Sequence, residues 1–239
     1  MTTNKEERPV QPSLFFQSHN EKGPETILLI HGACGSSKEW DKVIPHLTDQ
    51  NYHVLAPDLP MHGQSVSIKP FNLDTATSAI LHIISAHAKN GTVHLVGLSL
   101  RRSHRRMYRR TRGSGPNILS NIMLTEFPTE MRHLRTGQSS YGLIYEVIRT
   151  LCEPRPLGKI PVRTLVVAAQ KDSLLQRDSL DSAKKLFAAV DGGREGGSRV
   201  VLHRGILHAW HMFEPVLFGE MVVQWVGGKD VSSDFKDIE

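Results

Sequence analysis

The sequence has few cysteines and no long apolar run. Its 239 residues include two cysteines, Cys34 and Cys152, which are too few for a disulfide framework or a zinc cluster. No apolar run approaches the length of a membrane span. The first residues, MTTNKEERPVQPS, mix acid, base and proline without the apolar core of a signal peptide. We therefore expect a reduced, cytoplasmic protein with no membrane partner.

The chain has the length of one large α/β domain. Hydrophobic residues make up 39% of it, which is enough apolar material for a sizeable core. We expect this domain over residues 25–228, after a loose lead-in over 1–24 and before a polar tail over 229–239. Leu14–Gln17 is the candidate for a short edge strand within the lead-in.

Positive charge is concentrated in one tract. The net charge is +5, from 29 Lys and Arg against 24 Asp and Glu. Arg101–Arg112 (RRSHRRMYRRTR) holds seven arginines and no acid, and removing these seven charges from +5 leaves −2. The rest of the chain is therefore slightly acidic, and its basic character belongs to this tract alone.

Short apolar runs alternate with segments of helical periodicity. The runs predict buried strands at Ile27–Ile30, His53–Ala56, Val93–Leu98, Ile122–Leu124, Thr164–Ala169 and Val200–Leu202. Helical spacing predicts helices from Ser36 or Ser37 through Leu47, and over Leu73–His87, Leu180–Val190 and Phe213–Val226. This alternation predicts an α/β fold with a doubly wound, mostly parallel sheet.

A serine follows the third clear strand and is the candidate nucleophile. Gly97-Leu98-Ser99 ends an apolar run and precedes a segment that we expect to be helical. A serine on a sharp strand-to-helix turn presents its hydroxyl above the carboxyl edge of the sheet. Because a hydroxyl is a weak nucleophile, it needs a positioned base, and the base needs an orienting carboxylate.

The candidate acid is Asp172, which lies just beyond the strand predicted at Thr164–Ala169. Parallel sheets place functional groups at the carboxyl ends of their strands. Asp178 and Asp181 come later, at the start of the next helix, and are more typical of solvated or capping residues.

The candidate base is His208, one of 13 histidines. It lies in the middle of the loop between the last strand and the last helix, where it can reach across the sheet edge. His203, at the strand end, and His211, at the helix start, remain alternatives.

Two backbone N–H groups complete the candidate catalytic site. His31-Gly32-Ala33 follows the first clear strand, and its backbone can supply an N–H group beside the N–H of Leu100. Two such donors stabilise the charge that develops on a tetrahedral intermediate, so Ala33 and Leu100 are the candidate oxyanion hole.

Five segments together resemble the α/β-hydrolase superfamily. They are Ile27–Ser36, Val54–Ser65, Val93–Leu100, Leu165–Asp172 and Val200–Phe218. The last segment is similar to a fungal branch of hydrolases. The resemblance implies the serine-nucleophile branch of the superfamily, with Ser99 as nucleophile, Asp172 as acid and His208 as base.

Asp58–Ser65 is similar to the family's Asp-x-x-Gly-His-Gly-x-Ser pattern, with Met61 where glycine is usual. We expect Asp58 and His62 to support the loop structure and to take no part in catalysis.

The tract after Ser99 departs from the family. The family motif is Gly-x-Ser-x-Gly, but position 101 is arginine, and the following helix should be small and apolar. Burying seven unpartnered guanidinium groups would cost more than the whole stability of a domain. We therefore hypothesise a local frame slip, either in the gene model or as a true mutation.

The cap insertion is also reduced. The family inserts a cap between the strands predicted at Ile122–Leu124 and Thr164–Ala169, and here that segment has room for two short helices at most. We place this short cap at about 126–158. It implies a shallow or open pocket and leaves the substrate class open.

Three functions are consistent with these features. The first is a serine hydrolase that acts on an ester or related acyl bond of a small molecule, with no metal or cofactor and no nucleic-acid partner. The second is a catalytically inactive α/β-hydrolase-like protein, in which Arg101 disrupts the nucleophile turn. The third, ranked last, is nucleic-acid binding by Arg101–Arg112, which would be salt-dependent. The oligomeric state is left open.

The coding sequence tests the frame slip directly. CGN arginine codons read one nucleotide later give only Gly, Ala, Val or Asp when C or T follows. We expect the shifted frame from codon 101 to encode glycine and then a small-residue helix, with the original frame recovered by about Asn117. Resequencing that shows no glycine and no small-residue helix in the shifted frame would rule the hypothesis out.

Overall fold

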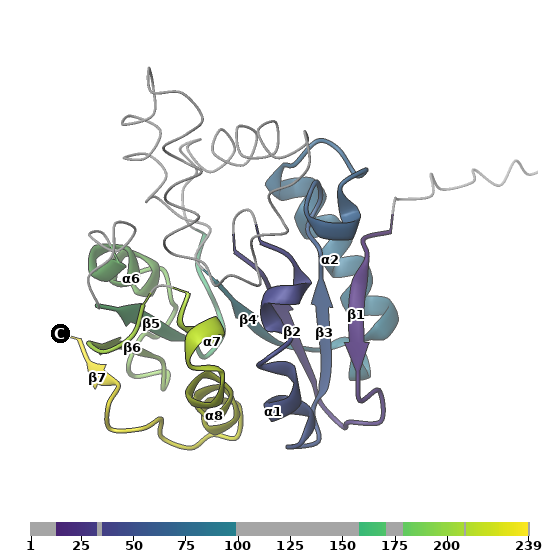
Figure 1. The fold of residues 1–239 in the computed structure, drawn as a ribbon. Coiled ribbons are helices and arrows are strands. Elements are labelled where there is room, and N and C mark those ends of the chain that lie inside the picture. Colours follow the sequence, from purple (N-terminus) through teal and green to yellow (C-terminus); the bar gives the residue numbers. More distant parts are fainter. Residues whose placement is uncertain (1–12, 33–34, 99–157, 171–178, 208, 239) are drawn as a thin grey trace, which may run out of the picture.

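The computed structural model describes residues 13–32, 35–98, 158–170, 179–207 and 209–238, and shows strands flanked by helices (Figure 1). The strands are β1 (Phe16–His19), β2 (Thr26–Ile30), β3 (His53–Pro57), β4 (His94–Gly97), β5 (Leu165–Ala169), β6 (Arg199–His203) and β7 (Lys236–Asp237). The α-helices are α1 (Ile44–Thr48), α2 (Leu73–His87), α6 (Ser179–Phe187), α7 (Trp210–Phe213) and α8 (Pro215–Val226). Short 3₁₀ turns are η1 (Ser37–Trp40), η2 (Gly63–Ser65) and η3 (Lys89–Gly91).

Strands β1 to β4 form a sheet in the order β1-β3-β2-β4. Strand β2 is parallel to both of its neighbours, with Ile27 opposite Val54 on β3 and opposite His94 on β4. Strand β1 lies antiparallel at the edge, two residues beyond the edge strand expected at Leu14–Gln17. The parallel core of this sheet brings the carboxyl ends of β2 and β4 together.

Strands β5 to β7 form a second ladder. Strands β5 and β6 are parallel, from Leu165 opposite Arg199 to Ala169 opposite His203, and β7 pairs antiparallel with β6. Within the part of the chain that the structure describes, no ladder joins β4 to β5. The strand expected at Ile122–Leu124 and nearly all of the cap expected at 126–158 lie outside the described residues.

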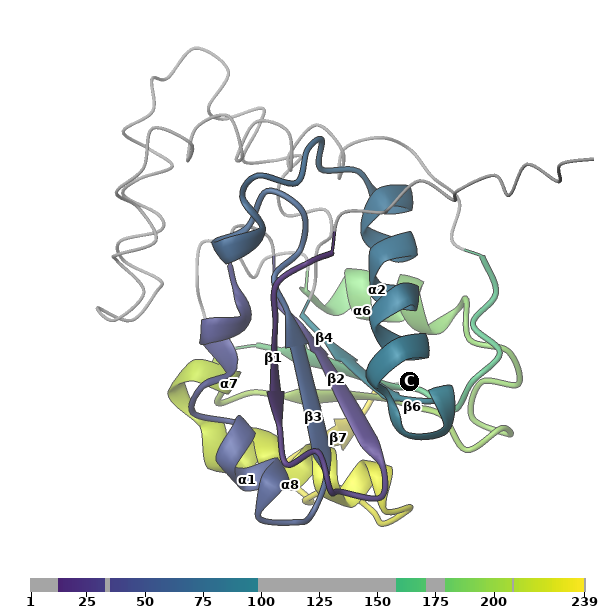
Figure 2. The same cartoon turned by 90° about the vertical axis from the view of Figure 1, so that its right-hand side faces the viewer.

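The faces of β2 belong to two different cores, as its wholly apolar run predicts. Ile27 and Leu29 pack with residues of α1 and α8, whereas Leu28 and Ile30 pack with residues of α2. Figure 2 shows the sheet between α2 on one side and α1 with α8 on the other. The predicted class, an α/β fold with a mostly parallel sheet and helices on both faces, is confirmed.

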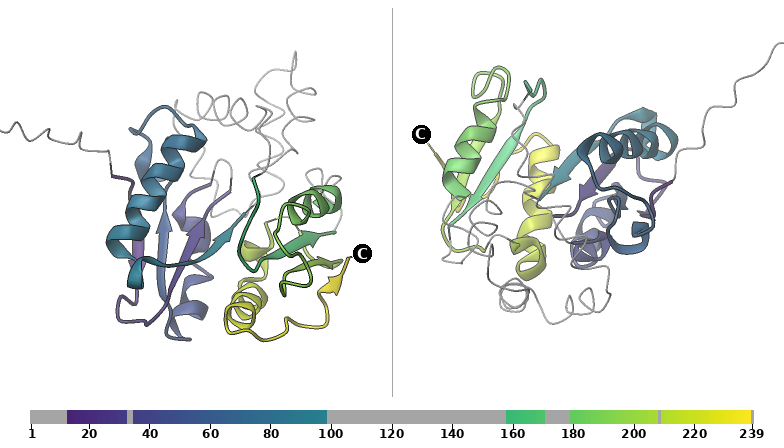
Figure 3. Two further views of the ribbon diagram at one scale, coloured as in Figure 1. Left: turned by 180° about the vertical axis from the view of Figure 1, so that it is seen from behind. Right: turned by 90° about the horizontal axis from the view of Figure 1, so that it is seen from above.

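One hydrophobic core joins the two ladders. Phe218 and Val222 of α8 belong to the same buried cluster as Ile27 of β2 and Val201 of β6. Helix α8 lies between the two groups of strands (Figure 3). The relative position of the two strand groups is therefore fixed by side-chain packing on α8.

Two prolines explain where the helix predictions fail. The continuous helix expected through Leu47 is wrong, because η1 ends at Trp40 and α1 starts at Ile44 with Pro45 in its first turn. Pro45 has no N–H group to donate to a preceding helical turn. In the same way Glu214, which precedes Pro215, is non-helical and separates α7 from α8. The helix expected over Leu73–His87 is observed with those bounds.

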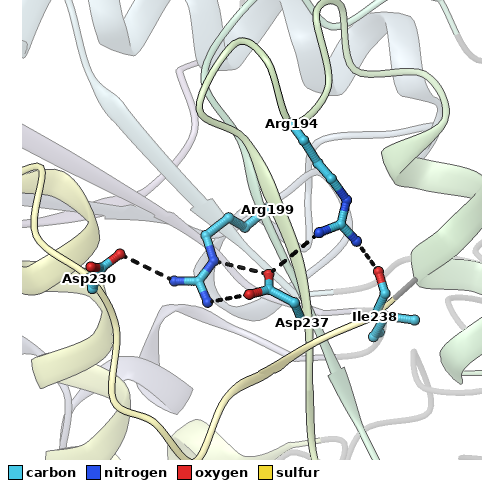
Figure 4. A network of polar contacts seen from close by, with 5 residues as sticks. All are labelled: Arg194, Arg199, Asp230, Asp237 and Ile238. Carbon is cyan, nitrogen blue, oxygen red and sulfur yellow. Dashed lines mark hydrogen bonds and ion pairs between the residues drawn. The ribbon is translucent and has the colours of Figure 1, made fainter.

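The tail after α8 packs onto the second ladder. Val231 and Phe235 are buried in the shared core, although this segment was expected to be polar. The Arg199 guanidinium donates two hydrogen bonds to the Asp237 carboxylate, at 3.1 and 2.9 Å, and so holds β7 beside β6 (Figure 4). Arg194 donates to the carbonyl of Ile238. The division of the chain at residues 25 and 228 stays a prediction.

Within the described segments, every helix is too short or too polar to cross a lipid bilayer.

The buried tail should contribute measurably to stability. Phe235 is 2% exposed and its ring lies 5.7 Å from that of Trp210. We expect Phe235→Ala to lower the free energy of unfolding by about 3 kcal/mol, because it leaves a cavity in the shared core. Lys236→Ala, at the exposed neighbouring position, is the control and should change it by less than about 0.5 kcal/mol. Equal urea midpoints for the two variants would show that the tail is not part of the core.

Candidate active site

The five residues that the sequence assigns to catalysis lie outside the described residues. They are Ala33, Ser99, Leu100, Asp172 and His208. The structure does describe the strand ends and the helix that lead directly to them, and these fix where the chain enters and leaves the candidate site.

The residues that precede Ala33 and Ser99 lie side by side. Ile30 is paired with Gly97 across β2 and β4, and the Leu98 N–H group donates to the Ile30 carbonyl at 3.2 Å. A Cβ atom on Gly32 would lie 3.6 Å from the Leu98 Cβ atom. The two segments predicted to carry the nucleophile and an oxyanion donor therefore start from adjacent points on the sheet edge.

The segments that lead to Asp172 and His208 also start together. The Gln170 N–H group donates to the His203 carbonyl at 3.0 Å, which extends the parallel ladder by one bond beyond β5. Gln170 is the last described residue before Asp172, and His203 ends β6. The acid and base loops therefore leave neighbouring strand ends.

A buried acid connects the turn after β2 with helix α7. The Gly32 N–H group donates to Glu39 Oε1 at 2.9 Å, and the same oxygen lies 3.8 Å from His211 Nε2. Burial raises the pKa of Glu39 to about 8, more than the Gly32 hydrogen bond lowers it. Helix α7 begins at Trp210, so this contact brings the loop after β6 to the turn after β2.

His31 supports the same turn from the other side. Its Nε2 accepts a hydrogen bond from the Leu59 N–H group at 3.0 Å, so the ring proton is on Nδ1 and is donated to the Gly32 carbonyl at 2.8 Å. Burial lowers the pKa of His31 to about 4, and the ring is neutral at pH 7. The neutral ring therefore connects the backbone of Gly32 to the backbone of Leu59.

Asp58 and His62 support loop structure, as expected. The buried Asp58 carboxylate accepts from the Ser37 N–H group at 2.6 Å and from the Gln64 N–H group at 2.7 Å. His62 Nδ1 lies 2.8 Å from the Pro60 carbonyl oxygen. Its ring packs 4.8 Å from that of His31. These contacts tie the loop after β3 to the turn after β2.

The alternative base and acid residues have other surroundings. His203 Nδ1 accepts from the Gly205 N–H group at 3.1 Å, and its ring packs 5.0 Å from that of Phe235 in the tail. His211 is fully buried, with its ring 4.6 Å from that of Trp40. Asp181 is exposed in the first turn of α6, and Asp178 lies outside the described residues.

Glu39 is the residue at this edge that the sequence reasoning missed. It stands between Lys38 and Trp40 in a segment expected to be an amphipathic helix, where an acid is typical of a solvated face. Nothing in its spacing indicates the contact with Gly32. Among the described residues, no three His, Cys, Asp or Glu side chains form a group that could hold a metal ion.

The arrangement of strands and helices defines a known fold. The structure is similar to that of MenH from S. aureus, with a TM-score of 0.68 and 19% identity over 89% of this chain and 98% of the other. A family model described as the alpha/beta hydrolase fold matches residues 25–100, which end directly before Arg101.

Sequence relatives define the family. The chain is 35% identical over 254 residues to an AB hydrolase superfamily protein of the fungus Gibberella zeae, which covers 95% of this chain and 89% of the relative. It is also 37% identical over 87 residues to the pimeloyl-[acyl-carrier protein] methyl ester esterase of Methylococcus capsulatus, covering 36% of this chain and 31% of the esterase. The chain belongs to the α/β-hydrolase superfamily, and the resemblance found in its sequence is confirmed.

The buried imidazole of His31 predicts a pH dependence of stability. An unfolded histidine titrates near 6.5, so between pH 6.5 and about 4 the unfolded chain binds a proton that the folded chain does not. This lowers the stability as the pH falls. Relative to His31→Gln, the wild type should lose about 2 kcal/mol of unfolding free energy between pH 7 and pH 5.

Urea unfolding of both proteins at the two pH values measures this difference. Because both proteins retain Glu39 and His62, whose pKa values are also shifted, the comparison isolates most of the effect of His31. A difference between the two proteins that does not change with pH would contradict the neutral, buried state of His31.

Proposed function

We propose that this chain is a serine hydrolase that cleaves an ester or a related acyl bond. The proposed nucleophile is Ser99, the base is His208 and the acid is Asp172. The backbone N–H groups of Ala33 and Leu100 form the proposed oxyanion hole. No metal or cofactor takes part in the proposed reaction.

The observation that carries this proposal is the adjacency of the strand ends. Gly32 and Leu98 lie side by side, and each directly precedes a proposed catalytic position. The loops that contain Asp172 and His208 leave the neighbouring ends of β5 and β6. This arrangement supports a nucleophile, a base and an acid in the chain order that serine α/β hydrolases use.

The proposed reaction has two steps. His208 takes the Ser99 proton as the hydroxyl oxygen attacks the carbonyl carbon, and returns it to the leaving alcohol as the ester bond breaks. Water then attacks the acyl-enzyme, again with His208 as base, and releases the carboxylic acid and Ser99. Asp172 orients the imidazole, and the two N–H groups stabilise the oxyanion of each tetrahedral intermediate.

The surroundings of the alternative histidines support His208 as the base. His203 bonds to the Gly205 backbone and packs on the tail, and His211 is buried against Trp40 beside Glu39. A general base must come within hydrogen-bond reach of the nucleophile, and the two rings are held by other contacts.

Ester chemistry is favoured by a relative named as a methyl ester esterase. We propose a small-molecule substrate, a cytoplasmic location and no nucleic-acid partner. Nucleic-acid binding by Arg101–Arg112 ranks last, because the tract directly follows Ser99, where the fold needs a buried helix, and no other segment resembles a nucleic-acid module.

A catalytically inactive protein is the second candidate. Its one motivating observation is Arg101, which stands where the family motif has glycine. A large side chain at this position obstructs the close approach of strand and helix that the nucleophile turn requires.

A fluorophosphonate probe separates the two candidates. An active serine hydrolase reacts with it at Ser99, so Ser99→Ala should abolish labelling and lower ester hydrolysis by at least about 10³-fold. Ser18→Ala is the matched control, because Ser18 also lies beside a histidine, with its Oγ 3.2 Å from His53 Nε2, yet has no proposed catalytic role. Absence of labelling in a folded wild type, shown by a cooperative urea transition, would favour the inactive protein.

A further inference from the structure

The Glu39 side chain has an unusual position for a carboxyl group. It projects from η1 and is 4% exposed, next to Trp40, which is fully buried. A carboxyl group in such surroundings is costly unless polar groups contact it. Its contacts therefore indicate what the group does in the fold.

The first of these contacts is with the turn after β2. Glu39 Oε1 accepts from the Gly32 N–H group at 2.9 Å, and the Gly35 N–H group closes the turn onto the Gly32 carbonyl at 3.1 Å. Gly35 also packs directly on the carboxyl group, since a Cβ atom there would overlap Glu39 Oε2. Gly32 and Gly35 therefore both contact the Glu39 side chain.

The second contact is with α7. Glu39 Oε1 lies 3.8 Å from His211 Nε2, and the ring of Trp40 lies 4.6 Å from the ring of His211. The backbone of α7 is itself fixed, because the Glu214 N–H group donates to the Trp210 carbonyl at 2.7 Å. The acid therefore bridges two segments that are far apart in the chain.

We propose that Glu39 is a positioning residue, which holds the backbone of Gly32 and Gly35 at a fixed distance from helix α7. The catalytic consequence rests on the proposed function: Ala33 lies between Gly32 and Gly35 in sequence, and His208 stands two residues before α7. Glu39 then sets the position of an oxyanion donor relative to the base, without contacting the substrate itself.

The chemistry of the Glu39 carboxyl group determines which substitutions test this proposal. Burial favours the protonated carboxyl group, because the pKa of Glu39 is raised to about 8. An amide has the shape of a protonated acid and keeps an oxygen that accepts from Gly32, so Glu39→Gln should preserve the bridge. Glu39→Leu keeps a similar volume but removes the acceptor, and should break it.

Kinetics with an activated ester such as p-nitrophenyl acetate tests the catalytic consequence. We expect Glu39→Leu to lower kcat about 10- to 100-fold with KM changed less than about twofold, because small misplacements of reacting groups have effects of this size. Glu39→Gln should stay within about threefold of the wild type. Equal kcat values for the two variants would overturn the catalytic role.

Amide hydrogen exchange tests the bridge in a way that does not depend on activity. In Glu39→Leu, the amides of Gly32 and Gly35 and that of Glu214 at the end of α7 should all lose protection at least about tenfold, and in Glu39→Gln they should keep it. Loss of protection at the glycines alone would overturn the bridge to α7. This readout decides the proposal even if the wild type proves inactive.

His211→Phe tests the contact between Glu39 and His211 with a substitution on α7. It replaces Glu39→Leu as the test if that variant does not fold. Phenylalanine keeps a ring against Trp40 and removes the nitrogen that faces Glu39. We expect the Gly32 amide to exchange faster in this variant, although the substitution lies on another element. Unchanged exchange at Gly32 would contradict the proposal.

Discussion

The structure depends on the hydrogen bonds that fix the backbone of Gly32, directly after β2. Strand β2 lies between β3 and β4 and packs on both faces, so the chain leaves it inside the protein. Polar side chains, in place of water, form hydrogen bonds with the backbone at this point. Glu39 accepts from the Gly32 N–H group, and His31 donates to the Gly32 carbonyl. These two residues fix a backbone that directly precedes a proposed oxyanion donor.

Much of the fold could be predicted from local sequence, because its signals are local. The apolar run Ile27–Ile30 indicates a strand buried on both faces, and helix α2 has the predicted bounds. The predictions fail where one residue interrupts a pattern, as Pro45 does in the first turn of α1. The role of Glu39 could not be predicted, because it depends on a contact with His211, which becomes a neighbour only in the folded chain.

The candidate site follows from motif order, and the structure supports it through the strand ends that lead to each residue. The family model matches residues 25–100, and the sequence relative of Gibberella zeae aligns over 95% of the chain. The positive tract Arg101–Arg112 begins where the family match ends. The hypothesised slip of the reading frame would explain the positive net charge, the missing glycine of the motif and the end of that match together.

The most direct test of the account is to locate a covalent adduct on the protein. Trypsin cleaves after Lys89 and Arg101 and so releases the peptide Asn90–Arg101, which contains Ser99. After reaction of the folded protein with a fluorophosphonate, tandem mass spectrometry of this peptide should place the phosphonyl group on the Ser99 oxygen. An adduct on another residue, or an unmodified peptide from folded protein, would contradict the assignment of Ser99 as the nucleophile.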